Sequence, residues 1–281
     1  MTDTWLDLTN RLDSPRERIF RDVTEVASQL GISFFVVGAC ARDLIMELYY
    51  GLPVQRATND IDVGLRLKNW EEFAQLKEAL IKKKKYRADL RQPQRLHATT
   101  GVILDLVPFG EVEKTETRSI AWPPDHQIEM NAFGFTEAYA HSLCVQLAVD
   151  LEVRVSSLAG LTLMKLVAWQ QRRQVKDAKD LKLILTRYLQ AGNLERLYSG
   201  ANEELLNEDQ FITLELTGVR LLGRDVASLL TAQNQPQVLE ILTDATALAA
   251  NMAAGAFEIE EAFTAAQRML EVLAQGITDT R

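Results

Sequence analysis

Residues 34–63 constrain the fold and the chemistry of this chain more than any other stretch. They read FFVVGACARDLIMELYYGLPVQRATNDIDV: an apolar run, a glycine, a segment with helical periodicity, and two aspartates on either side of one isoleucine. The apolar run ends at Gly38 and predicts a buried strand followed by a turn. Apolar residues close to a 3.6-residue period predict a helix from Ala39 to Tyr50.

The glycine turn before this helix is suited to an anion. The first turn of a helix has free backbone N–H groups, which favour phosphate, and a glycine lets the backbone approach it closely. Arg42 lies one turn into the helix, where it can add a charge-assisted contact to the same anion. We therefore expect Gly38, Ala39 and Arg42 to form a phosphate-binding turn.

Three aspartates stand in strand-like surroundings. Asp60 and Asp62 are two positions apart, so in a strand their side chains share one face and repel each other. A hard divalent cation such as Mg²⁺, shared with substrate phosphates, would relieve that repulsion. Asp105 interrupts the apolar run of residues 102–107, where a lone ionisable group needs a reason. If the two strands are neighbours, the three carboxylates form an acidic cluster able to hold metal ions.

The rest of the chain predicts two parts. Strands and helices are mixed up to about residue 156, which favours an α+β fold with a mixed sheet. Residues 86–91 and 102–107 read as strands around a loop that contains Pro93 and His97, and residues 111–155 as the remainder of the sheet. From residue 157 onward helical patterns dominate, with one of them running from Pro236 to Met252. We expect an α/β domain at 1–156 and a helical domain at 157–281.

Composition sets the expected compartment. The chain has 281 residues, 47% of them hydrophobic and 25% charged, as in globular proteins. Its first twenty residues lack the apolar segment of a signal peptide, and its apolar runs are too short for a membrane-spanning helix. The two cysteines, Cys40 and Cys144, have no metal-binding spacing and are expected to be reduced. We therefore expect a cytoplasmic protein without a membrane partner.

The net charge and one run of lysines bear on whether the chain binds nucleic acid. A net charge of −8 argues against an extended nucleic-acid surface but leaves room for a local patch. The run from Lys82 to Lys85 is such a patch. Its lysines either complement the end of a helix and face solvent, or provide a landing site for an RNA backbone or a triphosphate.

A second charged group follows in the helical part. Lys165 lies in a helix, LAGLTLMKLVAWQQRR, that is apolar nearly all round, so it either extends to the surface or points into a site. Asp177 and Asp180 share a helix face three residues apart, either as a solvated helix start or as part of a site.

Together these motifs resemble those of the nucleotidyltransferases related to DNA polymerase beta. The segments VVGACARDL, RATNDIDVGL, LDLVPFG, LMKLVAWQQRR and KDAKDL are similar to those of the AbiEii-type nucleotidyltransferases, the toxin half of type IV toxin–antitoxin systems. The chain departs from that pattern at Ala39, which replaces a second small Gly or Ser. The interval between Gly38 and Asp60 is also longer than in compact members of the family.

The resemblance implies a metal-dependent enzyme that transfers a nucleoside monophosphate from a nucleoside triphosphate to a hydroxyl. It implies that Asp60, Asp62 and Asp105 bind Mg²⁺ or Mn²⁺, and that Lys165 and Asp177 take part in catalysis, Lys165 by neutralising phosphate. The expected nucleotide-binding residues are Gly38, Ala39, Arg42, Thr58 and Lys165.

The acceptor stays open at this point. The toxin resemblance implies RNA, such as the 3′ end of tRNA, together with a cognate antitoxin protein. Transfer to a small molecule or to a protein side chain is the alternative within the same chemistry, and the acidic net charge favours it. An interaction module without catalytic activity is the alternative from another class.

Overall fold

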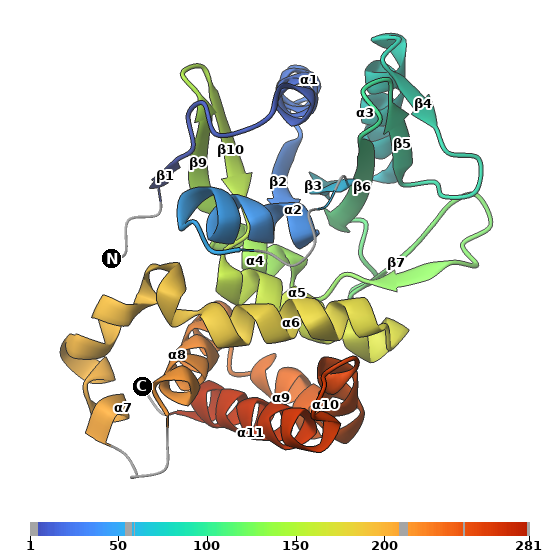
Figure 1. Cartoon of the computed structure of the whole chain (residues 1–281). Helices are drawn as coiled ribbons and strands as arrows, with labels where there is room; N and C mark the ends of the chain where they lie inside the picture. Colours follow the sequence, from blue (N-terminus) through green and yellow to red (C-terminus); the bar gives the residue numbers. More distant parts are fainter. Residues whose placement is uncertain (1–4, 54–57, 59, 208–212, 244, 280–281) are drawn as a thin grey trace. The chain divides into compact units, whose positions relative to one another are not determined.

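The structure is a computed structural model, and it describes residues 5–53, 58, 60–207, 213–243 and 245–279. Contacts divide the chain into two units, Met1–Ser157 and Leu158–Arg281. In Figure 1 the first unit runs from blue to green and the second from green to red. None of the helices that the structure describes is both long and apolar enough to cross a membrane.

The first unit is built on a mixed sheet in the order β1-β9-β10-β2-β3-β6-β5-β4 (Figure 1). Strand β3 is parallel to β6, antiparallel to β2, and β5 is antiparallel to β6. The predicted α+β class with a mixed sheet is therefore confirmed. The strands are β1 (Trp5–Asp7), β2 (Ser33–Val37), β3 (Asp60–Leu67), β4 (Tyr86–Ala88), β5 (Arg95–Ala98), β6 (Ile103–Gly110), β9 (Leu143–Ala148) and β10 (Leu151–Val155). A separate antiparallel pair is formed by β7 (Ser119–Ala121) and β8 (Glu129–Asn131).

Helices connect these strands. The longest are α1 (Ser14–Leu30) and α3 (Trp70–Lys82), and the carboxamide of Asn69 caps α3 by accepting from the backbone N–H of Glu72. Helix α2 (Gly38–Asp43) follows β2 directly and continues as a π-helical segment, Leu44–Tyr49, so the predicted helix from Ala39 to Tyr50 is largely confirmed. Helix α4 (Phe135–Ala140) lies within the range that the sequence assigned to the sheet.

The two faces of β3 differ in chemistry because strand residues alternate. Ile61, Val63 and Leu65 are fully buried on one face. On the other face Gly64 makes room for the ring of Phe35, which contacts the rings of Phe109 and Tyr139. This aromatic cluster covers the face next to Gly64, and Asp60 and Asp62 lie on the same face at the N-terminal end of β3.

The second unit is helical, as its composition predicted. Helices α5 (Leu158–Arg172) and α6 (Val175–Arg187) begin it, and short helical segments follow between Leu189 and Asn207. The remaining helices are α8 (Leu214–Leu229), α9 (Gln235–Thr243), α10 (Ala245–Ala253) and α11 (Ile259–Thr278). The pattern at Pro236–Met252, predicted as one helix, corresponds to α9 and α10 on either side of residue 244, which lies outside the described residues.

Candidate active site

The three candidate carboxylates stand on neighbouring strands. In the parallel pair β3–β6, Asp62 is directly opposite Asp105, and Asp60 lies two positions earlier on the same face of β3. The hypothesis that the Asp105 strand lies beside the Asp60 strand is confirmed by this register. Asp105 is buried, whereas Asp60 and Asp62 are half-buried.

Gly38 is packed against one of these carboxylates. Its backbone is left-handed, with φ of 67°, and Val37 before it is the register partner of Asp62 on β2. A Cβ at this position would overlap Asp62 Oδ2 and lie 3.0 Å from Asp62 Cγ. Glycine is therefore required twice, by the backbone conformation and by the close approach of the aspartate. The same contact places the start of α2 next to Asp62.

Asp105 has a partner that the sequence did not indicate. Arg95 donates from Nε to Asp105 Oδ1 over 2.8 Å and from a terminal nitrogen to Asp105 Oδ2 over 2.7 Å, a bidentate ion pair. Arg95 stands opposite Asp105 on β5. The segment was expected to be a loop around Pro93 and His97, and this expectation was wrong because four of its residues form a strand that pairs with β6.

The carboxylates raise the pKa of Arg95. The hydrogen bonds to Asp105 have the largest effect, burial acts in the opposite direction, and the charges of Asp105, Asp60 and Asp62 add to the increase. The guanidinium therefore experiences the field of all three aspartates.

The acidic residues of the site meet only some of the needs of a metal ion. Across the described ranges, no three acidic, histidine or cysteine side chains converge closely enough to form a metal site. Asp60 and Asp62 still provide the donor set that Mg²⁺ prefers, two hard oxygens on one strand face. Both oxygens of Asp105 accept from Arg95, so a metal at Asp105 would have to share these oxygens with the positively charged guanidinium or displace it.

Arg42 has a different environment from the one that the sequence predicted. It is buried, and its Nε and a terminal nitrogen donate to Asp43 Oδ1 over 2.8 and 2.6 Å. Burial raises the pKa of Asp43, and the neighbouring Arg42 opposes that increase. The guanidinium of Arg42 is thus held within the helix in an ion pair. A direct contact from Arg42 to phosphate stays a prediction from the sequence.

Thr58 and Cys40 border the same region. The hydroxyl of Thr58 accepts from the backbone N–H of Asp60 over 3.3 Å, so Thr58 shapes the entry to β3. Burial raises the pKa of the Cys40 thiol to about 12, which leaves it protonated and unreactive. Cys40 is therefore a core residue of α2, and Ala39 beside it is half-buried.

In the second unit, Lys165 belongs to a charged network. Its ammonium group donates to Asp177 over 3.2 Å and to Asp180 over 2.6 Å, and Arg172 donates to Asp177 over 2.8 Å. Asp177 is fully buried between α5 and α6, and its Oδ2 has no hydrogen-bond partner within the described parts of the chain. The structure therefore gives these residues a role in joining α5 to α6.

Three of the four lysines in the run at the end of α3 are also paired. Lys82 contacts Glu78 over 2.9 Å, Lys83 contacts Glu25 over 2.9 Å, and Lys85 contacts Asp22 of α1 over 3.3 Å. These ion pairs favour the solvated, charge-compensated interpretation over a landing site for RNA.

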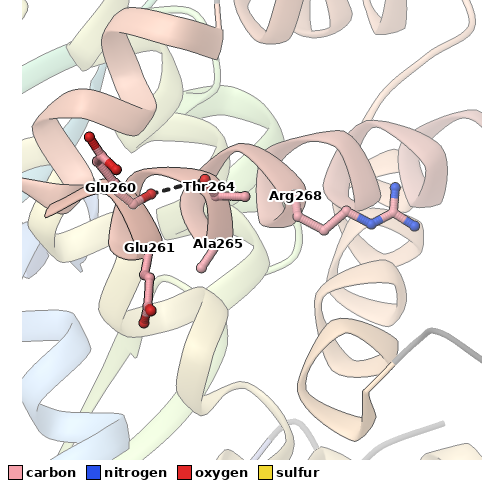
Figure 2. Close-up of a pocket in the computed structure, with 5 residues that line it drawn as sticks. All are labelled: Glu260, Glu261, Thr264, Ala265 and Arg268. Carbon is pink, nitrogen blue, oxygen red and sulfur yellow. Dashed lines mark hydrogen bonds between the residues drawn. The ribbon is translucent and has the colours of Figure 1, made fainter. Parts of the chain in front are cut away.

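An open hollow lies on helix α11. Figure 2 shows that its lining residues belong to this one helix and that Glu260 and Glu261 point in different directions. The hydroxyl of Thr264 donates to the carbonyl of Glu260, and Arg268 pairs with Glu271 over 3.2 Å. These side chains do not converge on a common point, so the hollow is not a catalytic site.

A glycine turn and three aspartates on adjacent strands, followed by a helical unit, form the arrangement that the resemblance to nucleotidyltransferases implied. A family model described as "Nucleotidyl transferase AbiEii toxin, Type IV TA system" matches residues 21–266. The chain therefore belongs to the AbiEii nucleotidyltransferase family.

Solved structures of low similarity were also found. ANT(2'')-Ia, an antibiotic-resistance factor, matches with 15% identity and a TM-score of 0.38, over 70% of this chain and 100% of its own. The Thermotoga maritima CCA-adding enzyme complexed with tRNA matches with 12% identity and a TM-score of 0.32, over 97% of this chain and 85% of its own. A CCA-adding enzyme in complex with ATP matches with 14% identity and a TM-score of 0.34, over 92% of this chain and 67% of its own. No curated protein matches this chain.

Proposed function

We propose that this nucleotidyltransferase is metal-dependent and transfers a nucleoside monophosphate from a nucleoside triphosphate to a hydroxyl of RNA, with the 3′ end of tRNA as the first acceptor to test. The observation that carries the proposal is the register of β3 and β6, which sets Asp105 opposite Asp62 while Gly38 packs against the Asp62 carboxylate. Membership of the AbiEii family supports the reaction class.

Each residue has a distinct task in the proposed reaction. Asp60 and Asp62 would hold Mg²⁺ or Mn²⁺, which supplies charge neutralisation for the triphosphate. Gly38 and Ala39 admit a phosphate to the backbone at the start of α2. Asp105 would complete this metal site and help to remove the proton of the acceptor hydroxyl. The acceptor oxygen bonds to the α-phosphorus, the bond from that phosphorus to its bridging oxygen breaks, and pyrophosphate leaves.

Four further residues belong to the proposal. A contact of Thr58 to the nucleotide stays a prediction from the sequence, and its hydroxyl accepts from the backbone N–H of Asp60. Contacts of Arg42 and Lys165 to phosphate, and a catalytic task for Asp177, stay predictions from the sequence, since all three side chains are engaged in ion pairs. We assign the chemistry to a catalytic domain, residues 1–156, and association with other helices to a helical domain, residues 157–281.

The family description supports further partners. A type IV toxin is neutralised by an antitoxin, so we propose a cognate antitoxin protein and a reaction in the cytoplasm. Transfer to a small molecule or a protein side chain is the second candidate. It is favoured by the net charge of −8 and by the pairing of the lysine run with Glu25, Asp22 and Glu78.

The proposal is tested by incubating the protein with Mg²⁺ and each of four nucleoside triphosphates labelled at the α-phosphate. Total RNA, a protein extract and a small-molecule extract are supplied as separate acceptors. Label in RNA that is lost after treatment with ribonuclease supports the proposed acceptor. Label in the protein or small-molecule fraction establishes the second candidate. Absence of label in all fractions, with Mn²⁺ as well as Mg²⁺, would favour an interaction module without activity.

A further inference from the structure

The ion pair of Arg95 with Asp105 lies at the acidic cluster and not in the apolar core. Strands β5 and β6 are held by backbone hydrogen bonds, and the apolar residues Leu96 and Leu104 are already buried in the core. An ion pair of two largely buried charges adds little net stability, because desolvation offsets their attraction. Its position at the acidic cluster therefore points to a role in the chemistry of the site.

Arg95 is the more exposed partner of the ion pair. About 21% of its side chain is exposed, against 11% of that of Asp105. Within the described segments, Asp105 is the one carboxylate that its guanidinium contacts. Rotation of the Arg95 side chain would free both oxygens of Asp105 without movement of a strand.

The positive charge of Arg95 opposes the binding of a metal ion at Asp105. Arginine stays protonated at any physiological pH, and its charge repels a divalent ion close to Asp105. A triphosphate reverses this balance, because its oxygens accept the same bidentate contacts from a guanidinium as a carboxylate does. Substrate can therefore draw Arg95 away from Asp105.

We propose that Arg95 is an exchangeable counter-cation of the active site, which holds Asp105 in the absence of substrate and passes to the nucleotide phosphates when Asp105 becomes a metal ligand. The inference rests on the proposed function. It makes Arg95 a catalytic residue that contacts substrate, and it makes metal binding and nucleotide binding mutually dependent.

The test measures Mn²⁺ binding by calorimetry, without nucleotide, for the wild-type chain and Arg95→Gln. Removal of the competing charge should tighten Mn²⁺ binding at least about tenfold. Affinity for the Mg²⁺ complex of a non-hydrolysable nucleoside triphosphate should fall by about the same factor, since a charge-assisted phosphate contact is lost. Arg87→Gln is the matched control, because Arg87 is an exposed arginine on neighbouring β4.

The outcomes distinguish a failure of the Arg95 inference from a failure of the proposed function. Equal or weaker Mn²⁺ binding by Arg95→Gln, with Asp60→Asn still losing the ion, overturns the role of Arg95 and leaves the proposed function intact. Failure of the wild-type chain and Arg95→Gln to bind Mn²⁺ contradicts both. If Arg95→Gln does not fold, Arg95→Met replaces it. Methionine also removes the charge, so Mn²⁺ binding should tighten in that variant too, and unchanged binding overturns the inference.

Discussion

At the scale of single residues, Gly38 links the sequence most directly to the site. Its left-handed backbone forms the turn between β2 and α2, and the absence of a side chain lets the carboxylate of Asp62 lie against it. The effect of the backbone and the effect of the Asp62 contact can be separated by experiment, because Gly51 has the same φ of 67°. Among the described residues, no atom lies within 4 Å of a Cβ built at Gly51.

We predict that Gly38→Ala lowers the free energy of unfolding by more than Gly51→Ala does. Gly51→Ala should cost about 1–2 kcal/mol, the usual cost of a left-handed non-glycine residue. Gly38→Ala has the same backbone cost and also displaces Asp62, so it should weaken binding of the Mg²⁺–nucleotide complex. Urea unfolding and calorimetry measure the two effects. Equal stability and unchanged nucleotide affinity in both variants would show that Asp62 does not depend on Gly38.

The three aspartates of the site could be predicted from the sequence, whereas Arg95 could not. Asp60, Asp62 and Asp105 were identified because a carboxylate inside an apolar strand is conspicuous. Arg95 was missed because it stands in RQPQRLHATT, where Pro93 and polar neighbours indicate a loop. The signal that could have revealed it is charge balance: three carboxylates brought together require a nearby cation, and the sequence does not specify which arginine supplies it.

At the scale of elements, strands with strong apolar patterns were predicted well. Strands β2, β3 and β6 were predicted from their apolar patterns, since local preference and burial agree there. Strand β1 was not predicted because its three residues gain their structure from pairing with β9. Helix α4 has six residues within a β-rich segment and is stabilised by contacts of Phe135 and Tyr139 with Phe35, which only the folded chain brings together.

The helix pair α5–α6 gives a prediction for Lys165. We expect Lys165→Met to lower the free energy of unfolding by about 1.5–3 kcal/mol, because the buried Asp177 loses a charged hydrogen-bond donor. The exposed residue Lys176 on α6 offers the control, and Lys176→Met should be close to neutral. If Lys165→Met is instead as stable as the wild-type chain but has weakened nucleotide affinity, the phosphate-binding hypothesis from the sequence is correct.

Helices α8 and α11 pack through two glycines. A Cβ at Gly276 would lie 3.0 Å from the Cα of Gly223 and would overlap the carbonyl of Arg220. We predict that Gly276→Ala destabilises the chain by about 1–3 kcal/mol, the usual cost of overpacking. Thr264→Ala, on the exposed face of the same helix, should change stability little. Thermal unfolding of both variants provides the measurement. Equal melting temperatures would show that α8 and α11 can move apart to admit a methyl group without a loss of stability.

At the scale of the whole molecule, the chain combines an α+β unit that carries the acidic residues with a helical unit. Membership of the AbiEii family was predicted from short motifs and is confirmed by a match over residues 21–266. Motifs predict the reaction class well because the chemistry fixes residue type and spacing. They do not predict the acceptor, since recognition depends on surface residues for which charge alone gives weak constraints.

The central claim is that Asp60, Asp62 and Asp105 together transfer a nucleotide. Its most direct test is the rate of transfer of α-labelled nucleotide to RNA by the wild-type chain, Asp60→Asn and Asp105→Asn, with Glu152→Gln as an exposed control on β10. We predict full activity for the control and a loss of at least about 100-fold for Asp105→Asn, which should still bind Mg²⁺–nucleotide. Asp60→Asn should lose both binding and transfer. Folded Asp105→Asn or Asp60→Asn that transfers label at the wild-type rate would contradict the account.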